Sequence, residues 1–159
     1  INGMVLGFYK NGKIPIMRDG KQWRPFVHVK DTSRAFQTVL ESEPQLVNHQ
    51  TFNVSSNEQN VQIYPLAQRV AEAINMPFNY EWYGSTDNRS YKVSFDKIAK
   101  TLKYKTKYTV KDGAQEVYQA LKKGELNPDD PKTITVKWYT HLLETQKLIK
   151  NLEIKGVIL

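Results

Sequence analysis

Residues 22–31 read QWRPFVHVKD, and this stretch decides the fold. Arg24 stands directly before a short apolar run over residues 26–29, which predicts a strand. Asp31 follows, and its side chain is one that favours the N-terminus of a helix. Apolar residues over 35–40 then recur at helical spacing. The stretch therefore predicts a strand that leads into an amphipathic helix, which is the repeating unit of α/β proteins.

The flanking sequence continues this alternation of strands and helices. Residues 1–9 show helical spacing, and residues 14–17, IPIM, predict an edge strand because proline cannot donate to a sheet ladder. Further strands are predicted over 51–54 and 78–82, and further helices from Pro65, Ser94, Asp112 and Thr133 onward. This order predicts the α/β class, with few strands and several helices. The strands are too few for a complete doubly wound sheet, so we expect part of a larger fold.

The charge of the chain is basic. The 159 residues carry 23 Lys+Arg against 16 Asp+Glu, which gives a net charge of +7. Six lysines fall within residues 97–111 with no acidic residue among them. Such a run is either a solvated face or a site for a polyanion such as nucleic acid. Because aromatic and basic residues do not alternate along a strand, as base stacking would require, nucleic acid is the less favoured partner.

Hydropathy and cysteine content bear on the compartment. No run of 18 apolar residues occurs, so the sequence predicts no membrane span. Cysteine is absent, which excludes disulfides and thiolate chemistry and is typical of a reducing compartment, so we expect a cytoplasmic protein. The first residue is Ile1 rather than methionine, and we expect a fragment or a processed piece.

Most catalytic patterns are missing. The three histidines, His28, His49 and His141, have no i, i+4 spacing and predict no metal site. No G-x-S-x-G motif and no cysteine is present to act as a nucleophile. The eight glycines do not form G-x-G-x-x-G, the turn whose backbone N–H groups approach a pyrophosphate. From the residues alone, we expect no catalytic group, metal or dinucleotide on this chain.

Three blocks of the sequence resemble one family. Residues 24–36, RPFVHVKDTSRAF, are similar to its pattern Arg-x-hydrophobic-hydrophobic-(His/Tyr)-Val-x-Asp. The blocks FNVSSNEQNVQIYPLAQRVAEAI at 52–74 and DNRSYKVSFDKIAKTLKYKTKYTVKDGAQEVYQAL at 87–121 follow in the family's order. Together they resemble the extended short-chain dehydrogenase/reductases that act on nucleotide sugars, the NAD-dependent epimerase/dehydratase family. The tail at 129–149 is similar to extensions of some nucleotide-sugar dehydratase and epimerase relatives.

The resemblance implies a fold and a division of labour. The chain would be the C-terminal portion of an extended Rossmann-type short-chain dehydrogenase, with the N-terminal dinucleotide-binding half absent. Residues 1–125 would form the substrate-binding part and residues 126–159 a C-terminal helical extension. In the family, the absent half binds NAD or NADP and supplies the catalytic residues, so we expect this chain alone to bind no cofactor and to be inactive. The full-length protein would be an isomerase or a lyase with a transient oxidoreductase step, and both alternatives stay open.

One catalytic motif of this family has a partial match. Tyr118 and Lys122 have the spacing of its Tyr-x-x-x-Lys pair, which brings both side chains to one face of a helix. However, Tyr118 falls on the apolar face of its predicted helix, and nine tyrosines make a chance match expected. We therefore interpret Tyr118 as a residue at the edge of the core.

The resemblance also implies which residues hold the substrate. The positions that match the family's substrate-binding residues are Arg24, Arg89, Asp87, Pro15, Ile16, Met17, Asn53 and Val61. Arg24 and Arg89 would hold the diphosphate, because a guanidinium offers a planar fork of donors to phosphate oxygens. Asp87 would orient Arg89 or bind a ribose hydroxyl, and the residues of the first strand would flank the nucleobase. Asn53 would lie near the phosphates, and Val61 would make an apolar contact.

The expected partners follow from this interpretation. The substrate would be a nucleotide sugar whose base and sugar these residues do not define, and no membrane is expected as a partner. The chain would pair with the missing N-terminal half or self-associate, because the absent sheet would leave strand edges and apolar faces bare. We expect only weak binding of nucleotide sugars by the chain alone, since half of the cleft is missing. The alternative is a non-enzymatic basic module that binds nucleic acid or another polyanion.

Overall fold

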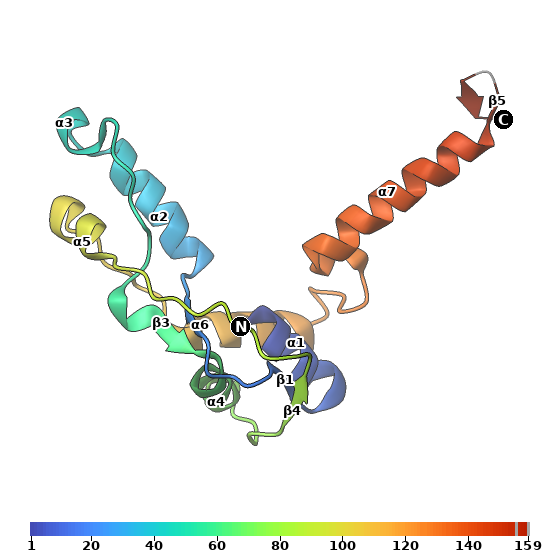
Figure 1. Ribbon diagram of the computed structural model, residues 1–159, viewed down its shortest axis with the longest axis horizontal. Helices are drawn as coiled ribbons and strands as arrows, with labels where there is room; N and C mark the ends of the chain where they lie inside the picture. The colour runs from blue at the N-terminus through green and yellow to red at the C-terminus, as the bar shows by residue number, and fades with distance from the viewer. Residues whose placement is uncertain (155, 159) are drawn as a thin grey trace. The chain divides into compact units, whose positions relative to one another are not determined.

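The computed structural model describes residues 1–154 and 156–158. Its helices are α1 (Asn2–Asn11), α2 (Val29–Leu40), α3 (Pro44–Val47), η1 (Asn57–Gln59), α4 (Ile63–Ala73), α5 (Asp96–Leu102), α6 (Val110–Lys122), η2 (Pro131–Thr133) and α7 (Thr135–Leu152). Its strands are β1 (Ile14–Met17), β2 (Trp23–Pro25), β3 (Asn60–Gln62), β4 (Tyr80–Tyr83), β5 (Glu153–Ile154) and β6 (Val157–Ile158). The predicted α/β class, with several helices and few strands, is confirmed (Figure 1).

The chain divides into two compact units, Ile1–Gln119 and Ala120–Leu159. The first contains every element from α1 to α5 and most of α6. The second contains η2, α7 and the antiparallel pair of β5 and β6. The roles expected for residues 1–125 and 126–159 stay predictions.

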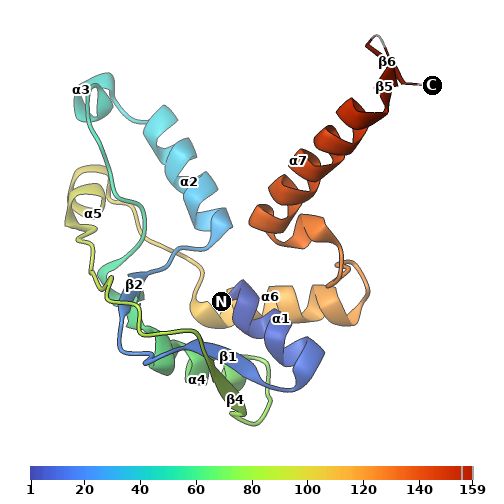
Figure 2. The same cartoon turned by 45° about the vertical axis from the view of Figure 1, so that its right-hand side comes forward.

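A parallel pair of strands, β1 and β4, forms the centre of the first unit. Ile14 lies opposite Tyr80 and Met17 opposite Tyr83, and helices α1 and α4 both pack against β1 (Figure 2). Residues alternate along β1, so that Ile14 and Ile16 are fully buried while Pro15 and Met17 are only half-buried. This alternation gives β1 one face for the core and one face for a site.

The strand predicted at 78–82 is found two residues later, as β4, and it is not the half-buried strand that its alternation of aromatic and polar residues predicts. All four residues of β4 are exposed, because β1 is its only strand neighbour within the described residues. Its aromatic rings instead pack on one another and on Tyr64 of α4. The centroid of the Trp82 ring lies 5.9 Å from that of Tyr64, with the two rings stacked. Helix α4 itself begins at Ile63, two residues before the predicted start at Pro65.

The antiparallel pair of β2 and β3 supports the residue that the sequence singles out. Arg24 on β2 lies opposite Val61 on β3. The strand predicted over residues 26–29 is wrong, because strand pairing ends at Pro25 and the helix already begins at Val29. The residue at the N-cap of α2 is His28, whose Nδ1 accepts a hydrogen bond from the Lys30 backbone N–H at 3.2 Å.

Asp31, expected as the helix cap, has a different role. Its side chain is fully buried, and its carboxylate accepts the backbone N–H groups of Lys107 and Tyr108, each at 2.9 Å. Arg34 donates to the same carboxylate at 2.7 Å, and the Tyr104 hydroxyl donates to the Asp31 carbonyl at 2.7 Å. A buried carboxylate requires such compensation. Asp31 thus ties the start of α2 to the segment that precedes α6.

A second core cluster lies between α2 and α5. Ala35, Phe95, Ile98 and Tyr104 are buried there, and Phe52 and Val54 pack against them together with Val93 and Leu102. The segment at 51–54, predicted as a strand, packs through these two side chains but pairs with no strand among the described residues.

The remaining helices are close to their predicted positions. Helix α5 begins at Asp96, whose N–H donates to the Ser94 hydroxyl at 3.4 Å. In the first turn of α6 the Asp112 carboxylate accepts the Thr109 backbone N–H at 2.7 Å, and the Asp112 backbone N–H donates to the Thr109 hydroxyl at 3.4 Å. In the second unit, α7 begins two residues after the predicted start at Thr133 and ends at Leu152. No helix within residues 1–154 and 156–158 combines the length and the apolar character that crossing a membrane requires.

Candidate functional site

Three of the residues predicted to bind substrate form one ion cluster. Asp87 Oδ2 accepts Arg24 Nη2 at 2.7 Å and Arg89 Nη2 at 3.1 Å. Asp87 Oδ1 accepts Arg89 Nε at 2.9 Å and the Arg89 backbone N–H at 3.0 Å. These four hydrogen bonds fill the acceptor sites of one carboxylate. Asp87 therefore bridges two guanidinium groups from distant parts of the chain.

The position of Arg24 is fixed by further contacts. Its Nη1 donates to the Trp23 carbonyl at 2.8 Å and also to the Arg89 carbonyl. Its guanidinium carbon lies 5.1 Å from the centre of the Tyr91 ring, a cation–π distance. Its side chain is only 19% exposed, whereas that of Arg89 is 81% exposed. Arg24 is thus held in one orientation, while Arg89 projects into solvent.

The electrostatics of the cluster keep Asp87 ionised. Hydrogen bonds from the Arg89 side chain and backbone, together with the charges of Arg89 and Arg24, lower the pKa of Asp87 from 3.8 to about 2. The same carboxylate raises the pKa of the Arg89 guanidinium. The cluster therefore carries one net positive charge at neutral pH.

A hollow of about 310 Å³ lies beside this cluster. Its lining residues are Ile1, Gly3, Met4, Pro15, Met17, Gln22, Arg24, Ile63, Tyr83 and Asp87. Four of the predicted substrate-binding residues, namely Pro15, Met17, Arg24 and Asp87, therefore lie around one cavity. Arg89 is outside the lining but is joined to it through Asp87.

The other three predicted residues lie elsewhere. Ile16 is fully buried in the core, because neighbouring residues of a strand point to opposite faces. Val61 is buried on β3, where it pairs across the strands with Arg24. Asn53 is exposed, and its amide donates to the Ser94 carbonyl at 3.4 Å. None of the three is part of the lining of the hollow.

Six of the lining residues were missed by the sequence reasoning, among them Gln22 and Tyr83. Gln22 is 5% exposed, and its Oε1 is buried without a hydrogen-bond partner among the described residues. The spacing of Gln22 and Arg24, two residues apart, is the signal that would have placed both on one side of an extended segment. Tyr83 ends β4 opposite Met17, a pairing that no local pattern indicates.

A larger hollow of about 610 Å³ lies at a different place in the first unit. Its basic residues are Arg69, Lys107 and Lys111, and the carboxylates of Glu58 and Glu72 lie among them. It contains none of the predicted substrate-binding residues. The lysines of residues 97–111 are spread over α5, the following loop and the start of α6. No group of three potential metal ligands comes together within residues 1–154 and 156–158.

The partial Tyr-x-x-x-Lys match has a structural explanation. Tyr118 is half-buried, and its ring packs edge-on against that of Tyr9 on α1, with 6.5 Å between the centroids. This is the environment expected for a residue at the edge of the core.

The comparisons with known proteins agree with the resemblance. A model of the NAD dependent epimerase/dehydratase family matches residues 1–55. No curated protein matches the chain. The predicted resemblance to the extended short-chain dehydrogenase/reductases is confirmed by this match and by the structural neighbours.

Those structural neighbours are nucleotide-sugar enzymes. UDP-glucuronic acid 4-epimerase from Bacillus cereus, in complex with UDP-glucuronic acid and NAD, is 16% identical, with a TM-score of 0.63 over 76% of this chain and 38% of its own. UDP-glucose 4-epimerase from Thermotoga maritima, with UDP-glucose, is 16% identical, with a TM-score of 0.63 over 77% and 39%. dTDP-glucose 4,6-dehydratase from Bacillus anthracis, in complex with NAD, is 21% identical, with a TM-score of 0.60 over 77% and 38%. The chain thus spans about two fifths of the length of these proteins.

The strand-to-helix junction of the described residues lacks the glycine-rich turn that holds a dinucleotide. A pyrophosphate is bound where a glycine-rich turn joins a strand to the N-terminus of a helix. In this chain the strand that runs directly into a helix is β3, and the residues around its junction with α4, NVQIYPL, contain no glycine. No step of a reaction is assigned to NAD on this chain.

Proposed function

We propose that this chain is the substrate-binding part of an NAD(P)-dependent nucleotide-sugar epimerase or dehydratase. The observation that carries the proposal is the pair of guanidinium groups, Arg24 and Arg89, joined by Asp87 at the hollow beside β1. The chemistry of hydride removal and return would belong to the part of the protein that carries the catalytic residues. The role of this chain would be to hold the nucleotide diphosphate.

The donors left over in the cluster suit a diphosphate. A guanidinium has five N–H donors. Arg24 uses three of its donors in the hydrogen bonds described above, and Arg89 uses two. Among the described contacts, two donors of Arg24 and three donors of Arg89 therefore remain for phosphate oxygens. Charge-assisted hydrogen bonds of this kind contribute about 1.5–3 kcal/mol each. The arginines are positioned beforehand by Asp87, so little ordering entropy is lost on binding.

Other lining residues suggest how the remainder of the nucleotide is held. Asp87 has no free acceptor, so its role is to orient the arginines rather than to bind a ribose hydroxyl. Gln22 Oε1 is a buried acceptor without a donor among the described residues, and a ligand hydroxyl would satisfy it. Met17 and Tyr83 offer an apolar surface for the nucleobase.

The direct test is a titration of the chain with UDP-glucose and dTDP-glucose, followed by calorimetry and by NMR of the backbone amides. We expect weak binding, with a Kd on the order of 1 mM, because half of the cleft is absent. Amide shifts should be concentrated at Arg24, Tyr83 and Asp87. A micromolar Kd of the chain alone for either nucleotide sugar would contradict the interpretation that half of the binding cleft is absent. Shifts at Lys107 and Lys111 instead would favour the polyanion module and contradict the proposal.

A further inference from the structure

Strand β4 has a free edge. Its partner β1 lies on one side, and no other strand pairs with it within residues 1–154 and 156–158. The carbonyl groups of Asn79 and Tyr83 accept hydrogen bonds from backbone N–H groups at the two ends of β1. Because backbone groups alternate in direction along a strand, those of Tyr80 and Trp82 face away from β1. These groups are a template for another strand.

This edge lacks most of the features that protect an edge strand. Edge strands are commonly blunted by lysine, by proline or by a bulge. Residues 80–83, YEWY, contain neither lysine nor proline, and all four pair with β1 in an unbroken register. Their one charged side chain is that of Glu81. Tyr80 is 37% exposed, Trp82 39% and Tyr83 48%, so the edge is accessible to a second strand.

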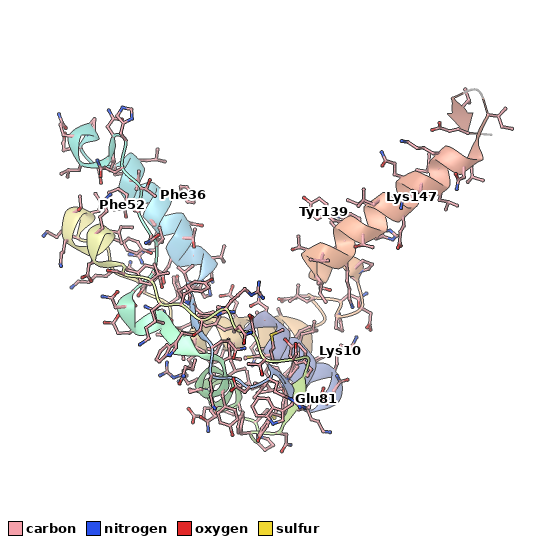
Figure 3. All side chains as sticks on the ribbon, in the orientation of Figure 1. Lys10, Phe36, Phe52, Glu81, Tyr139 and Lys147 are labelled. Atoms are coloured by element: carbon pink, nitrogen blue, oxygen red, sulfur yellow. The ribbon has the colours of Figure 1, made fainter. Side chains whose placement is uncertain are left out.

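The two faces of β4 have different surroundings. Trp82 stacks on Tyr64 of α4, and the Tyr80 ring packs edge-on against the same tyrosine, with 5.5 Å between the centroids. Glu81 and Tyr83 lie on the opposite face, and Tyr83 lines the hollow beside the arginine cluster. Figure 3 shows Glu81 on this strand. A strand added at the free edge would therefore border the hollow.

We propose that β4 pairs with β4 of a second copy of the chain about a two-fold axis at Trp82, so that Glu81 of each copy lies opposite Tyr83 at the hollow of the other. A two-fold axis brings two identical strands together in antiparallel orientation. The pairing is argued from β4 itself. The role given to Glu81 rests on the proposed function, since it takes the hollow to hold the nucleotide.

The register follows from backbone direction and charge. Only residues whose backbone groups face the free edge exchange hydrogen bonds, which allows a two-fold axis at Tyr80, Glu81 or Trp82. An axis at Tyr80 would extend the ladder to Asn79, where the backbone N–H bonds back to the carbonyl two residues earlier. An axis at Glu81 would place two carboxylates directly opposite each other, which is destabilising. An axis at Trp82 pairs this residue with itself and Glu81 with Tyr83, with no like charges opposed.

A carboxylate from the second copy would add a hydrogen-bond acceptor to the hollow. The acceptor sites of Asp87 are filled by the two arginines, so Asp87 is not available to a ligand hydroxyl. Glu81 of the second copy, beside Tyr83, would accept a hydroxyl of the ribose or of the sugar.

The pairing is expected to be weak. It joins two strands of four residues each, which is a small interface, and we expect a dimer Kd on the order of 100 μM. The net charge of +7 opposes association at low ionic strength, and 0.15 M salt screens this repulsion beyond about 8 Å.

Single cysteines test the register, because the chain contains no cysteine of its own. In the proposed ladder, the two Cα atoms at position 82 lie about 5.5 Å apart, within the range that a disulfide spans. Those at position 81 are diagonal neighbours, about 7–8 Å apart and beyond that range. Under mild oxidation, Trp82→Cys should form a covalent dimer about 10-fold faster than Glu81→Cys. The opposite order, or equally slow formation by both variants, would overturn the inference.

A matched pair of charge variants tests the same ladder without cysteine chemistry. Tyr83→Lys places a cation opposite Glu81 at two symmetric points and should tighten the dimer by about 5-fold. Tyr83→Glu places a second carboxylate there and should weaken it by about 5-fold. Both variants remove the same ring, so a merely structural effect would shift both dimer constants in one direction. Sedimentation equilibrium in 0.15 M salt gives the constants, and circular dichroism checks folding. Shifts of the same sign, or a parent chain that stays monomeric at 1 mM, would contradict the pairing.

UDP-glucose separates this inference from the proposed function. If Glu81 reaches the ligand across the interface, 10 mM UDP-glucose should tighten the dimer by about 3-fold, and Glu81→Gln should abolish this effect. Equal tightening in Glu81→Gln would refute the role of Glu81. A dimer with the Trp82 register that does not bind UDP-glucose would refute the proposed function and leave the pairing. Binding of UDP-glucose at Arg24 by a chain that stays monomeric would do the reverse.

Discussion

The Nη2 atom of Arg24 lies 2.7 Å from Oδ2 of Asp87, although 63 residues separate them in the chain. Arg24 belongs to β2, whereas Asp87 lies in the loop after β4. This ion pair joins the two strand pairs of the first unit at the rim of the hollow that Arg24 lines. A change at either residue should therefore affect both stability and ligand binding.

The first prediction concerns the acid stability of the Asp87 cluster. The pKa of Asp87 is about 2 in the folded chain, below its ordinary value of 3.8. A lowered carboxyl pKa stabilises the folded state above the unfolded pKa, and this contribution is lost as the pH falls through the folded pKa. Urea unfolding between pH 6 and pH 2 should thus show a loss of stability from about pH 4 downward.

The matched variants for this experiment are Asp87→Asn and Glu81→Gln. Asp87→Asn should be less stable at pH 6 and should show a flatter pH dependence than the parent chain. Glu81 is exposed on β4, and no ion pair involves it within the described residues (Figure 3). Glu81→Gln should follow the parent chain, and an Asp87→Asn profile that coincides with the parent's would contradict the assigned role.

The second prediction distinguishes the hollow beside the arginine cluster from the larger hollow that Lys107 and Lys111 line. Arg24→Ala should weaken binding of UDP-glucose by about 10- to 100-fold, because it removes charge-assisted hydrogen bonds to the diphosphate. Lys111→Ala, in the larger hollow, should leave this affinity unchanged. Calorimetry or NMR titration of the chain provides the measurement. If Lys111→Ala weakened UDP-glucose binding more than Arg24→Ala, the diphosphate would be bound in the larger hollow instead.

The third prediction concerns Asp31. Asp31→Ala removes the acceptor for the Lys107 and Tyr108 backbone N–H groups and the charge partner of Arg34. The free energy of unfolding should fall by about 3 kcal/mol. Asp31→Asn keeps one acceptor oxygen and should lose less. Chemical denaturation measures both, and an equal loss for the two variants would show that packing rather than hydrogen bonding sets the cost.

The fourth prediction compares two glycines with left-handed backbones. Gly20 has a φ of 78°, and a Cβ there would lie 2.9 Å from the Tyr64 Cβ. Gly84 has a φ of 63°, and a Cβ at that position would meet nothing within 4 Å. Gly84→Ala should cost about 1 kcal/mol from backbone strain alone, and Gly20→Ala about 3 kcal/mol, since the clash adds to the strain. Equal losses in thermal unfolding would contradict this account.

Periodicity alone predicts most of the helices. The apolar spacing of α4 and α7 and the aspartate near the start of α6 place these helices within about two residues of their observed starts. Strands are predicted less well, because pairing depends on segments that are distant in the chain. TFNV at 51–54 has strand composition but no partner among the described residues, and β4 has a partner on one side only. Asp31 was expected at a helix cap because aspartate favours that position. Its contacts with Lys107 and Tyr108 join residues that are distant in the chain, and local sequence patterns do not predict such contacts.

The candidate site likewise combines features that the sequence predicts with features that it does not predict. Arg24, Asp87 and Arg89, which the resemblance implies as substrate-binding residues, share one ion cluster. The strand period should have excluded Ile16, because its neighbours Pro15 and Met17 occupy the face that lines the hollow. The substrate role of all eight predicted residues stays a prediction.

The separate positions of the three tryptophans, of which Trp82 stacks on Tyr64, have a spectroscopic consequence. The sequence contains three tryptophans, and each belongs to a different region: Trp23 precedes Arg24 on β2, Trp82 lies on β4, and Trp138 lies on α7 with His141 stacked against it. Variants that retain a single indole would therefore emit from one region at a time. Fluorescence could then follow occupancy of the arginine cluster, melting of the parallel strands and unwinding of the last long helix as three separate optical signals.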